Sequence, residues 1–117
     1  MPHTILIVDD HEDFRRTVRA LLEAEGFEVV GEAADGESAI TDARRLRPKL
    51  VLLDIRLPDI DGFEVAARLA QGADPPTVVL TSSRDESTYR RRLALSAAQA
   101  FIPKSELSAV ALAAFLA

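Results

Sequence analysis

Five short apolar runs recur along the chain at nearly regular intervals, and this spacing limits the possible folds more than any other feature. The runs start at residues 4, 27, 50, 77 and 100 and read TILIV, FEVVGEA, LVLLD, TVVLT and AFI. They are rich in valine, isoleucine and leucine and alternate little with polar residues, which is typical of parallel strands buried on both faces. Each interval leaves room for one helix and two short turns.

Helical patterns fill the intervals between the runs. Phe14, Val18 and Leu22 recur at helical spacing before Gly26, which stands where a C-terminal cap is expected. Similar apolar patterns are present in the segments 39–46, 63–70, 89–93 and 105–117. The alternation predicts an α/β fold, a doubly wound five-stranded parallel sheet with right-handed crossovers and five helices on its two faces.

Length and composition narrow the class of protein. A chain of 117 residues without a linker or low-complexity segment indicates one domain over residues 1–117. The net charge of −5 argues against nucleic-acid binding by this domain, and the absence of cysteine excludes a disulfide framework and a thiolate metal site. The sequence has no apolar segment of membrane-spanning length and no signal peptide. We therefore expect a cytoplasmic protein without membrane contact.

Polar side chains stand where the expected strands end. Asp9 and Asp10 follow the first strand, Asp54 ends the third, Thr81 ends the fourth, and Lys104 follows the fifth. Because the carboxyl ends of parallel strands meet at one edge of a sheet, these residues are expected to converge there. Three clustered carboxylates repel one another, and a divalent cation relieves the repulsion. Oxygen ligands favour Mg²⁺, so the sequence predicts a metal-assisted anion site.

This combination of groups is suited to phosphoryl chemistry. The Asp54 carboxylate is expected to act as the nucleophile and to form an acyl phosphate. Mg²⁺ and Lys104 would neutralise charge on the phosphoryl oxygens, while Thr81 would donate a hydrogen bond to one of them. An ionised carboxylate needs no general base for this attack.

Four segments resemble the receiver domain of two-component response regulators, in the same order and over essentially the whole chain. They are ILIVDD at 5–10, LLDIRLPDIDG at 52–62, VVLTS at 78–82 and FIPK at 101–104. The resemblance implies a flavodoxin-like receiver fold over residues 1–117. It also implies the role of a signalling domain that catalyses only its own phosphorylation and dephosphorylation.

The resemblance also implies the residues of a Mg²⁺ site. Asp54 would be the phosphoacceptor and Asp10 a direct metal ligand. Asp9 would assist, either directly or through water, and the backbone carbonyl of Arg56 would complete the protein ligands.

The remaining roles that the resemblance implies concern switching. Thr81 would be the switch hydroxyl, Lys104 the lysine that binds the phosphoryl group, and Phe101 the aromatic residue that changes rotamer. The phosphodonor would be a sensor histidine kinase or a phosphotransfer protein, with a small acyl phosphate as a further donor. The output would be a change of affinity for an effector or a second copy through the fourth helix, the fifth strand and the fifth helix.

Three alternatives stay open at this point. A small Mg²⁺-dependent phosphohydrolase with an aspartate nucleophile, of the haloacid dehalogenase type, uses similar groups. That type places its nucleophile in a D-x-D pattern after the first strand and adds a cap region. This chain has adjacent Asp9 and Asp10 at that position and no spare residues for a cap region. A nucleotide or flavin module needs a Gly-rich or Ser/Thr-rich loop where this chain has DDHEDF. A receiver-like module that is never phosphorylated is the third alternative, and the intact Asp54 and Lys104 count against it.

Two further expectations concern residues near the site and at the end of the chain. Asp59 and Asp61 are expected to be turn and helix-start residues, and His11 an exposed loop residue. In the last helix one apolar stripe is expected to face the sheet, namely Leu107, Val110, Ala111 and Ala114. An opposite, solvent-facing stripe is expected to form a dimer or partner surface with the arginines of the fourth helix; these residues are Leu112, Leu116, Arg90, Arg91 and Arg92.

Overall fold

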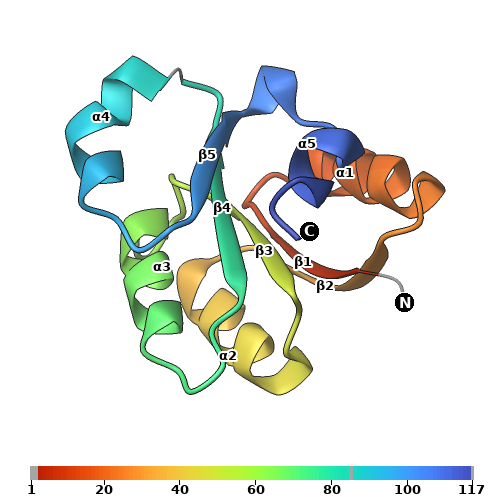
Figure 1. Ribbon diagram of the computed structural model, residues 1–117, viewed down its shortest axis with the longest axis horizontal. Coiled ribbons are helices and arrows are strands. Elements are labelled where there is room, and N and C mark those ends of the chain that lie inside the picture. The colour runs from red at the N-terminus through yellow and green to blue at the C-terminus, as the bar shows by residue number, and fades with distance from the viewer. Residues whose placement is uncertain (1–2, 85, 117) are drawn as a thin grey trace.

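The computed structural model describes residues 3–84 and 86–116, and one parallel sheet organises this part of the chain (Figure 1). In chain order the elements are β1 (Thr4–Val8), α1 (Glu12–Ala24), β2 (Glu28–Ala33), α2 (Gly36–Leu46), β3 (Leu50–Asp54), α3 (Gly62–Ala70), β4 (Thr77–Ser82), α4 (Glu86–Ala94), β5 (Ala100–Pro103), the 3-10 turn η1 (Lys104–Glu106) and α5 (Ala109–Ala113). The strand order is β2-β1-β3-β4-β5, and every neighbouring pair is parallel. This confirms the doubly wound α/β fold.

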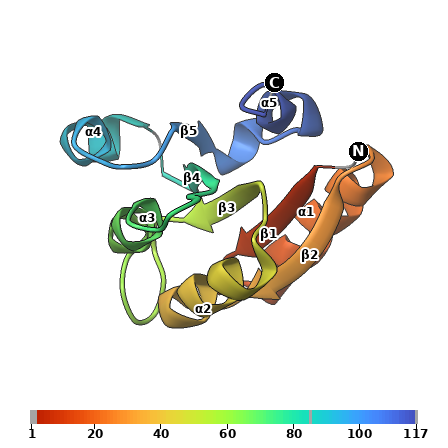
Figure 2. The same ribbon diagram turned by 60° about the horizontal axis from the view of Figure 1, so that its bottom comes forward.

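The helices cover both faces of the sheet and create two hydrophobic cores. On one face, α2 and α3 pack over the strands, and α4 adds partly buried residues at the margin. On the other face, α1 and α5 pack over alternate residues of the same strands. Figure 2 shows the sheet between these two layers. The central strand β3 is buried along its whole length, as its uninterrupted LVLLD sequence predicts. None of the helices in residues 3–84 and 86–116 is long and apolar enough to cross a membrane.

Aspartates fix the loop that follows β3. Asp61 caps α3, because its side chain accepts a hydrogen bond from the Glu64 backbone N–H at 3.0 Å. Asp59 reaches across to the start of α2 and accepts hydrogen bonds from the backbone N–H groups of Gly36 and Glu37 at 2.8 and 2.9 Å. These N–H groups hold the pKa of Asp59 at about 2. Both aspartates are thus turn and cap residues, as expected from the sequence.

The expectation for the last helix is wrong in two respects. The helical segment is shorter than residues 105–117, because α5 starts after the Ser108 cap, whose side chain accepts a hydrogen bond from the Ala111 N–H at 3.0 Å. The stripes are also partly reversed, since Leu112 is 1% exposed and packs in the core, whereas Val110 is 81% exposed.

The reason for this reversal lies in the composition of the segment. Nearly every residue from 107 to 116 is apolar, so helical spacing alone does not identify the buried side. In the structure the helix begins after the Ser108 cap, and Ala109 and Leu112 are the residues that pack towards the sheet. Leu116 is partly buried against the same cluster. Leu112 and Leu116 therefore do not form the solvent-facing partner surface that the pattern predicted.

Gly62 allows the loop after β3 to close tightly. A Cβ atom at this position would lie 2.6 Å from the backbone oxygen of Asp54 and 2.9 Å from the Cα of Ile55. The Gly62 N–H donates a hydrogen bond to the Ile55 carbonyl at 2.8 Å. The start of α3 therefore lies directly against the end of β3, where Asp54 stands.

We expect Gly62→Ala to lower the free energy of unfolding by about 1 to 3 kcal/mol, because the new methyl group would push on backbone atoms that cannot move independently. The matched control is Gly72→Ala, where the nearest atom to a new Cβ would be the Leu69 oxygen at 3.6 Å, an ordinary contact. Its effect should stay within about 0.5 kcal/mol. Urea denaturation of both variants measures the difference, and equal effects would contradict the close approach.

Candidate functional site

The strand register brings the polar residues of the sequence motifs to one edge of the sheet. Asp9 directly follows β1, Asp54 is the last residue of β3, and Asp54 is paired in register with Thr81 of β4. Ile102 of β5 pairs with Thr81, and Lys104 begins the turn after β5. The expected convergence of these side chains at the carboxyl edge is therefore what the structure shows.

Lys104 links two of the carboxylates. Its Nζ lies 2.6 Å from Asp9 Oδ2 and 3.5 Å from Asp54 Oδ2. The same ammonium lies 4.2 Å from the centroid of the Phe14 ring, on whose face it makes a cation–π contact. Asp9 is fully buried and Asp54 is 4% exposed. The ammonium is therefore the counter-charge that allows two carboxylates to be buried side by side.

The two buried carboxylates have opposite pKa shifts. Burial raises the pKa of Asp54 to about 6, and the nearby negative charge of Asp9 adds to the increase, which Lys104 only partly offsets. Burial alone would also raise the pKa of Asp9. Hydrogen bonding and charge attraction from Lys104, with hydrogen bonds from His11, outweigh it and hold that pKa below its ordinary value. Asp9 is thus the carboxylate more firmly held in its ionised form.

Four side chains form a cluster with the composition of a cation site. Asp9, Asp10, His11 and Asp54 each place one possible ligand atom within 4.8 Å of all the others. The cluster holds three carboxylates, and Lys104 pairs with two of them, Asp9 and Asp54. This leaves negative charge that a divalent ion would balance. Carboxylate oxygens are the ligands that Mg²⁺ prefers, so the donor set fits this ion.

Arg56 lies in the loop after β3. The contact that the structure shows is made by its backbone N–H and not by its carbonyl. Its backbone N–H donates to Asp54 Oδ1 at 3.3 Å, and its side chain is exposed. This hydrogen bond orients the Asp54 carboxylate. The role of the Arg56 carbonyl as a metal ligand stays a prediction.

Thr81 is in place beside Asp54, and its hydroxyl has a partner on the neighbouring strand. The side chain is fully buried, and Oγ1 donates a hydrogen bond to the Ile102 carbonyl at 2.6 Å. Phe101, the preceding residue of β5, is half-buried and has its ring centroid 6.5 Å from that of Tyr89 in α4. The Thr81 hydroxyl on β4 is therefore hydrogen-bonded to the residue that follows Phe101 on β5.

His11 is the residue that sequence reasoning missed. Its side chain is 69% exposed, as expected of a loop residue, yet its Nδ1 lies 3.0 Å from Asp9 Oδ1 and 3.0 Å from Asp10 Oδ1. The His11 backbone N–H also donates to Asp9 Oδ1 at 2.8 Å. The available signal was its position directly after two aspartates at a strand end. The carboxylates beside it in the sequence were its partners, so a second histidine was not needed.

Arg15 braces the same turn from the first helix. Its guanidinium donates from Nη1 to the Asp9 carbonyl at 2.7 Å and from Nε to Glu32 Oε1 at 2.9 Å. Glu32 also accepts from Arg19 at 2.7 Å, and these two arginines lower its pKa, with Arg19 contributing most. The turn after β1 is thus tied to β2 and α1, which holds the backbone of Asp9 in place.

The comparisons with known proteins all indicate the same family. A sequence model described as the response regulator receiver domain matches residues 5–115. BvgA of Bordetella pertussis, a positive transcription regulator of virulence factors, is 42% identical over 106 residues, which cover 91% of this chain and 51% of BvgA. A protein-glutamate methylesterase/protein-glutamine glutaminase of Anaeromyxobacter dehalogenans is 41% identical over 97 residues, covering 82% of this chain and 28% of that protein. The chain thus spans about half the length of BvgA and less of the methylesterase.

A solved structure agrees over nearly the whole chain. The signal receiver domain of the response regulator NarL from Mycobacterium tuberculosis has a TM-score of 0.85 and 32% identity, and the match covers 98% of this chain and 97% of that domain. Together with the flavodoxin-like strand order, this favours a receiver over the phosphohydrolase and the nucleotide module. The chain belongs to the response regulator receiver domain family.

Proposed function

We propose that this protein accepts a phosphoryl group on Asp54 from a sensor histidine kinase or a phosphotransfer protein, in a Mg²⁺-dependent reaction. The observation that supports this most is the Asp54 carboxylate, buried at the end of β3 with Lys104 Nζ 3.5 Å away and two further aspartates beside it. Residues 1–117 would act as one receiver domain in the cytoplasm. This domain would catalyse only its own phosphorylation and dephosphorylation.

The reaction follows from the chemistry of these groups. An Asp54 carboxylate oxygen attacks the phosphorus atom, a new P–O bond forms, and the bond from phosphorus to the donor imidazole nitrogen breaks with its electron pair leaving on that nitrogen. Lys104 offsets negative charge on the transferred group. Asp9, Asp10 and Asp54 would hold Mg²⁺, which when bound supplies further charge neutralisation at the phosphoryl oxygens.

Switching is proposed to start at Thr81. Once a phosphoryl oxygen stands beside Asp54, it offers the hydroxyl a charged acceptor, which competes with the neutral Ile102 carbonyl that accepts the hydrogen bond now. Rotation of Thr81 towards the phosphoryl group would release β5 locally. Phe101 lies on the same strand, so its rotamer would respond to this release.

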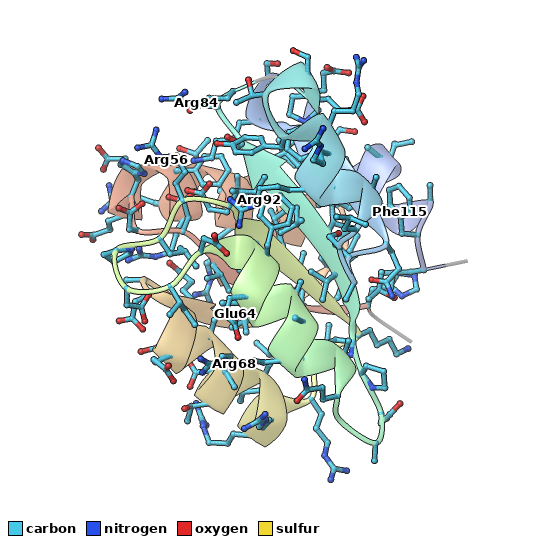
Figure 3. All side chains as sticks on the ribbon, turned by 90° about the vertical axis from the view of Figure 1, so that its left-hand side faces the viewer. Arg56, Glu64, Arg68, Arg84, Arg92 and Phe115 are labelled. Atoms are coloured by element: carbon cyan, nitrogen blue, oxygen red, sulfur yellow. The ribbon has the colours of Figure 1, made fainter. Side chains whose placement is uncertain are left out.

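The element most able to respond is α4, because it has no buried residue among those described in it. A series of rings holds it: the centroids of Phe63 and Tyr89 are 6.1 Å apart, and those of Tyr89 and Phe101 are 6.5 Å apart. Arg92 adds an ion pair with Asp61 and lies 4.2 Å above the Phe63 ring. Figure 3 shows Arg92 extending from α4 towards the start of α3. Because none of its described residues is buried, small shifts of Phe101 would move α4.

The proposed output surface comprises α4, β5 and α5, which lie next to one another in Figure 1. Its most exposed large apolar residues are Leu95, just after α4, which is 84% exposed, and Val110 of α5, which is 81% exposed. These two residues replace Leu112 and Leu116 as the apolar contacts for an effector or a second copy.

The first experiment tests the phosphoacceptor. With Mg²⁺ and acetyl phosphate, the wild type should gain one phosphoryl group that is labile to hydroxylamine, as acyl phosphates are. Asp54→Asn should gain none, because a neutral amide is a poor nucleophile. Asp74→Asn, in an exposed loop after α3, is the matched control and should label like the wild type. Intact-mass spectrometry measures the added mass, and undiminished labelling of Asp54→Asn would refute the assignment.

The raised pKa of Asp54 generates a test of stability without any phosphodonor. An unfolded aspartate has a pKa near 3.8, so the folded state favours the protonated carboxyl, and this advantage is lost as the pH rises through about 6. At pH 7.5 without divalent ions, the buried charge should cost about 2 to 3 kcal/mol. Asp54→Asn should therefore raise the free energy of unfolding at pH 7.5 by up to that amount, and by much less at pH 4.

Chemical denaturation at the two pH values measures this difference. Adding Mg²⁺ at pH 7.5 should stabilise the wild type more than Asp54→Asn. The two proteins should then differ less in their free energy of unfolding. A variant that is less stable than the wild type at pH 7.5, or a gap that is the same at both pH values, would contradict the charge burial inferred for Asp54.

The switch is tested with Thr81→Val, which keeps the shape of the side chain and removes the hydroxyl. Beryllofluoride with Mg²⁺, a mimic of the phosphoryl group, should change amide hydrogen exchange in α4 and β5 of the wild type. The change should be absent or much smaller in Thr81→Val. Thr77→Val, at the opposite end of β4, is the matched control and should respond like the wild type. An unaltered response in Thr81→Val would rule out this route.

A further inference from the structure

The His11 imidazole contacts two of the carboxylates in the proposed metal site. Nδ1 lies 3.0 Å from Asp9 Oδ1 and 3.0 Å from Asp10 Oδ1, and it belongs to the group of atoms that are all within 4.8 Å of one another. The Asp9 carboxylate is itself held by the His11 backbone N–H at 2.8 Å. Ring and carboxylate are thus fixed relative to each other by one short turn.

These distances match the spacing of neighbouring ligands around one ion. In an octahedral site with bonds of about 2.1 Å, adjacent ligand atoms are roughly 3.0 Å apart. Nδ1 therefore stands at ligand spacing from one oxygen of Asp9 and one oxygen of Asp10.

Nδ1 is within hydrogen-bond distance of Asp9 Oδ1, and a bound ion would take the place of the proton in that contact. The imidazole does not cap the first turn of α1. His11 is the N-cap of that helix, yet its side chain makes no capping hydrogen bond. The side chain is 69% exposed, so Nε2 can carry the proton and donate it to water. That tautomer leaves the Nδ1 lone pair available for a metal ion, which is the form in which histidine acts as a ligand.

The geometry points to His11 Nδ1 as a ligand of the divalent ion, beside the carboxylates of Asp9, Asp10 and Asp54. This inference rests on the metal site of the proposed function and adds a nitrogen donor to it. Imidazole nitrogen suits Ni²⁺ and other transition-metal ions better than Mg²⁺, which prefers oxygen. His11 therefore shifts the selectivity of the site towards transition-metal ions relative to a site of carboxylates alone.

Pulsed electron paramagnetic resonance of bound Mn²⁺ tests the ligand directly, because a coordinated imidazole nitrogen modulates the electron spin echo. The chain contains two histidines, so the signal can be assigned by substitution. The nitrogen modulation is expected in the wild type and in His3→Ala, whose imidazole packs against Phe27 with ring centroids 5.9 Å apart. It should vanish in His11→Ala, a variant that loses no capping hydrogen bond.

Calorimetric titrations give an independent readout. His11→Ala should weaken Ni²⁺ binding on the order of tenfold and change Mg²⁺ binding much less. Mn²⁺ bound to the wild type without nitrogen modulation, or modulation that persists in His11→Ala, would overturn the inference and leave a site of oxygen ligands. An equal loss of Ni²⁺ and Mg²⁺ affinity would also overturn it, since a structural effect has no metal preference. A wild type that binds none of these ions would contradict the proposed metal site itself, and this inference with it.

Discussion

The ion pair between Lys104 and Asp9 is the interaction on which the rest of the site depends. Two carboxylates buried side by side would not stay ionised without a counter-charge, and the Lys104 ammonium lies 2.6 Å from one and 3.5 Å from the other. The compensation is unequal, since the pKa of Asp9 is lowered while that of Asp54 is raised to about 6. The site therefore holds excess negative charge that either a divalent ion or a proton can relieve. This is the physical basis for both the proposed metal binding and the proposed reactivity of Asp54.

The loop after β3 and the turn after β1 hold the charged side chains of the site in fixed positions. Gly62 lets α3 begin directly against Asp54, and the aspartates at 59 and 61 hold the loop by hydrogen bonds to the starts of α2 and α3. On the other side of the sheet edge, Arg15 fixes the turn that carries Asp9. In contrast, α4 is held by ring contacts and the Arg92–Asp61 ion pair. A firmly braced site beside a helix with no buried residue in its described part is an arrangement in which a local change of charge can move a distant surface.

The sequence predicts most of this, and where it fails the reason is physical. Regular apolar runs determine the strands, and parallel topology then brings Asp9, Asp54, Thr81 and Lys104 together without further information. The buried side of α5 was not predictable from spacing, because almost every residue in and around this helix is apolar. The contact of His11 with Asp9 and the hydrogen bond from Thr81 to Ile102 depend on side-chain rotamers. The spacing of apolar residues in the sequence carries no information about these rotamers.

The central claim is that Asp54 carries the phosphoryl group, and locating that group on the chain tests it most directly. Borohydride reduces an aspartyl phosphate to homoserine, so the modified position is fixed as a stable change of residue mass. After phosphorylation in the presence of Mg²⁺, reduction and digestion, fragment spectra should place homoserine at position 54. Homoserine at Asp9, Asp10 or another aspartate, with position 54 unchanged, would contradict the account.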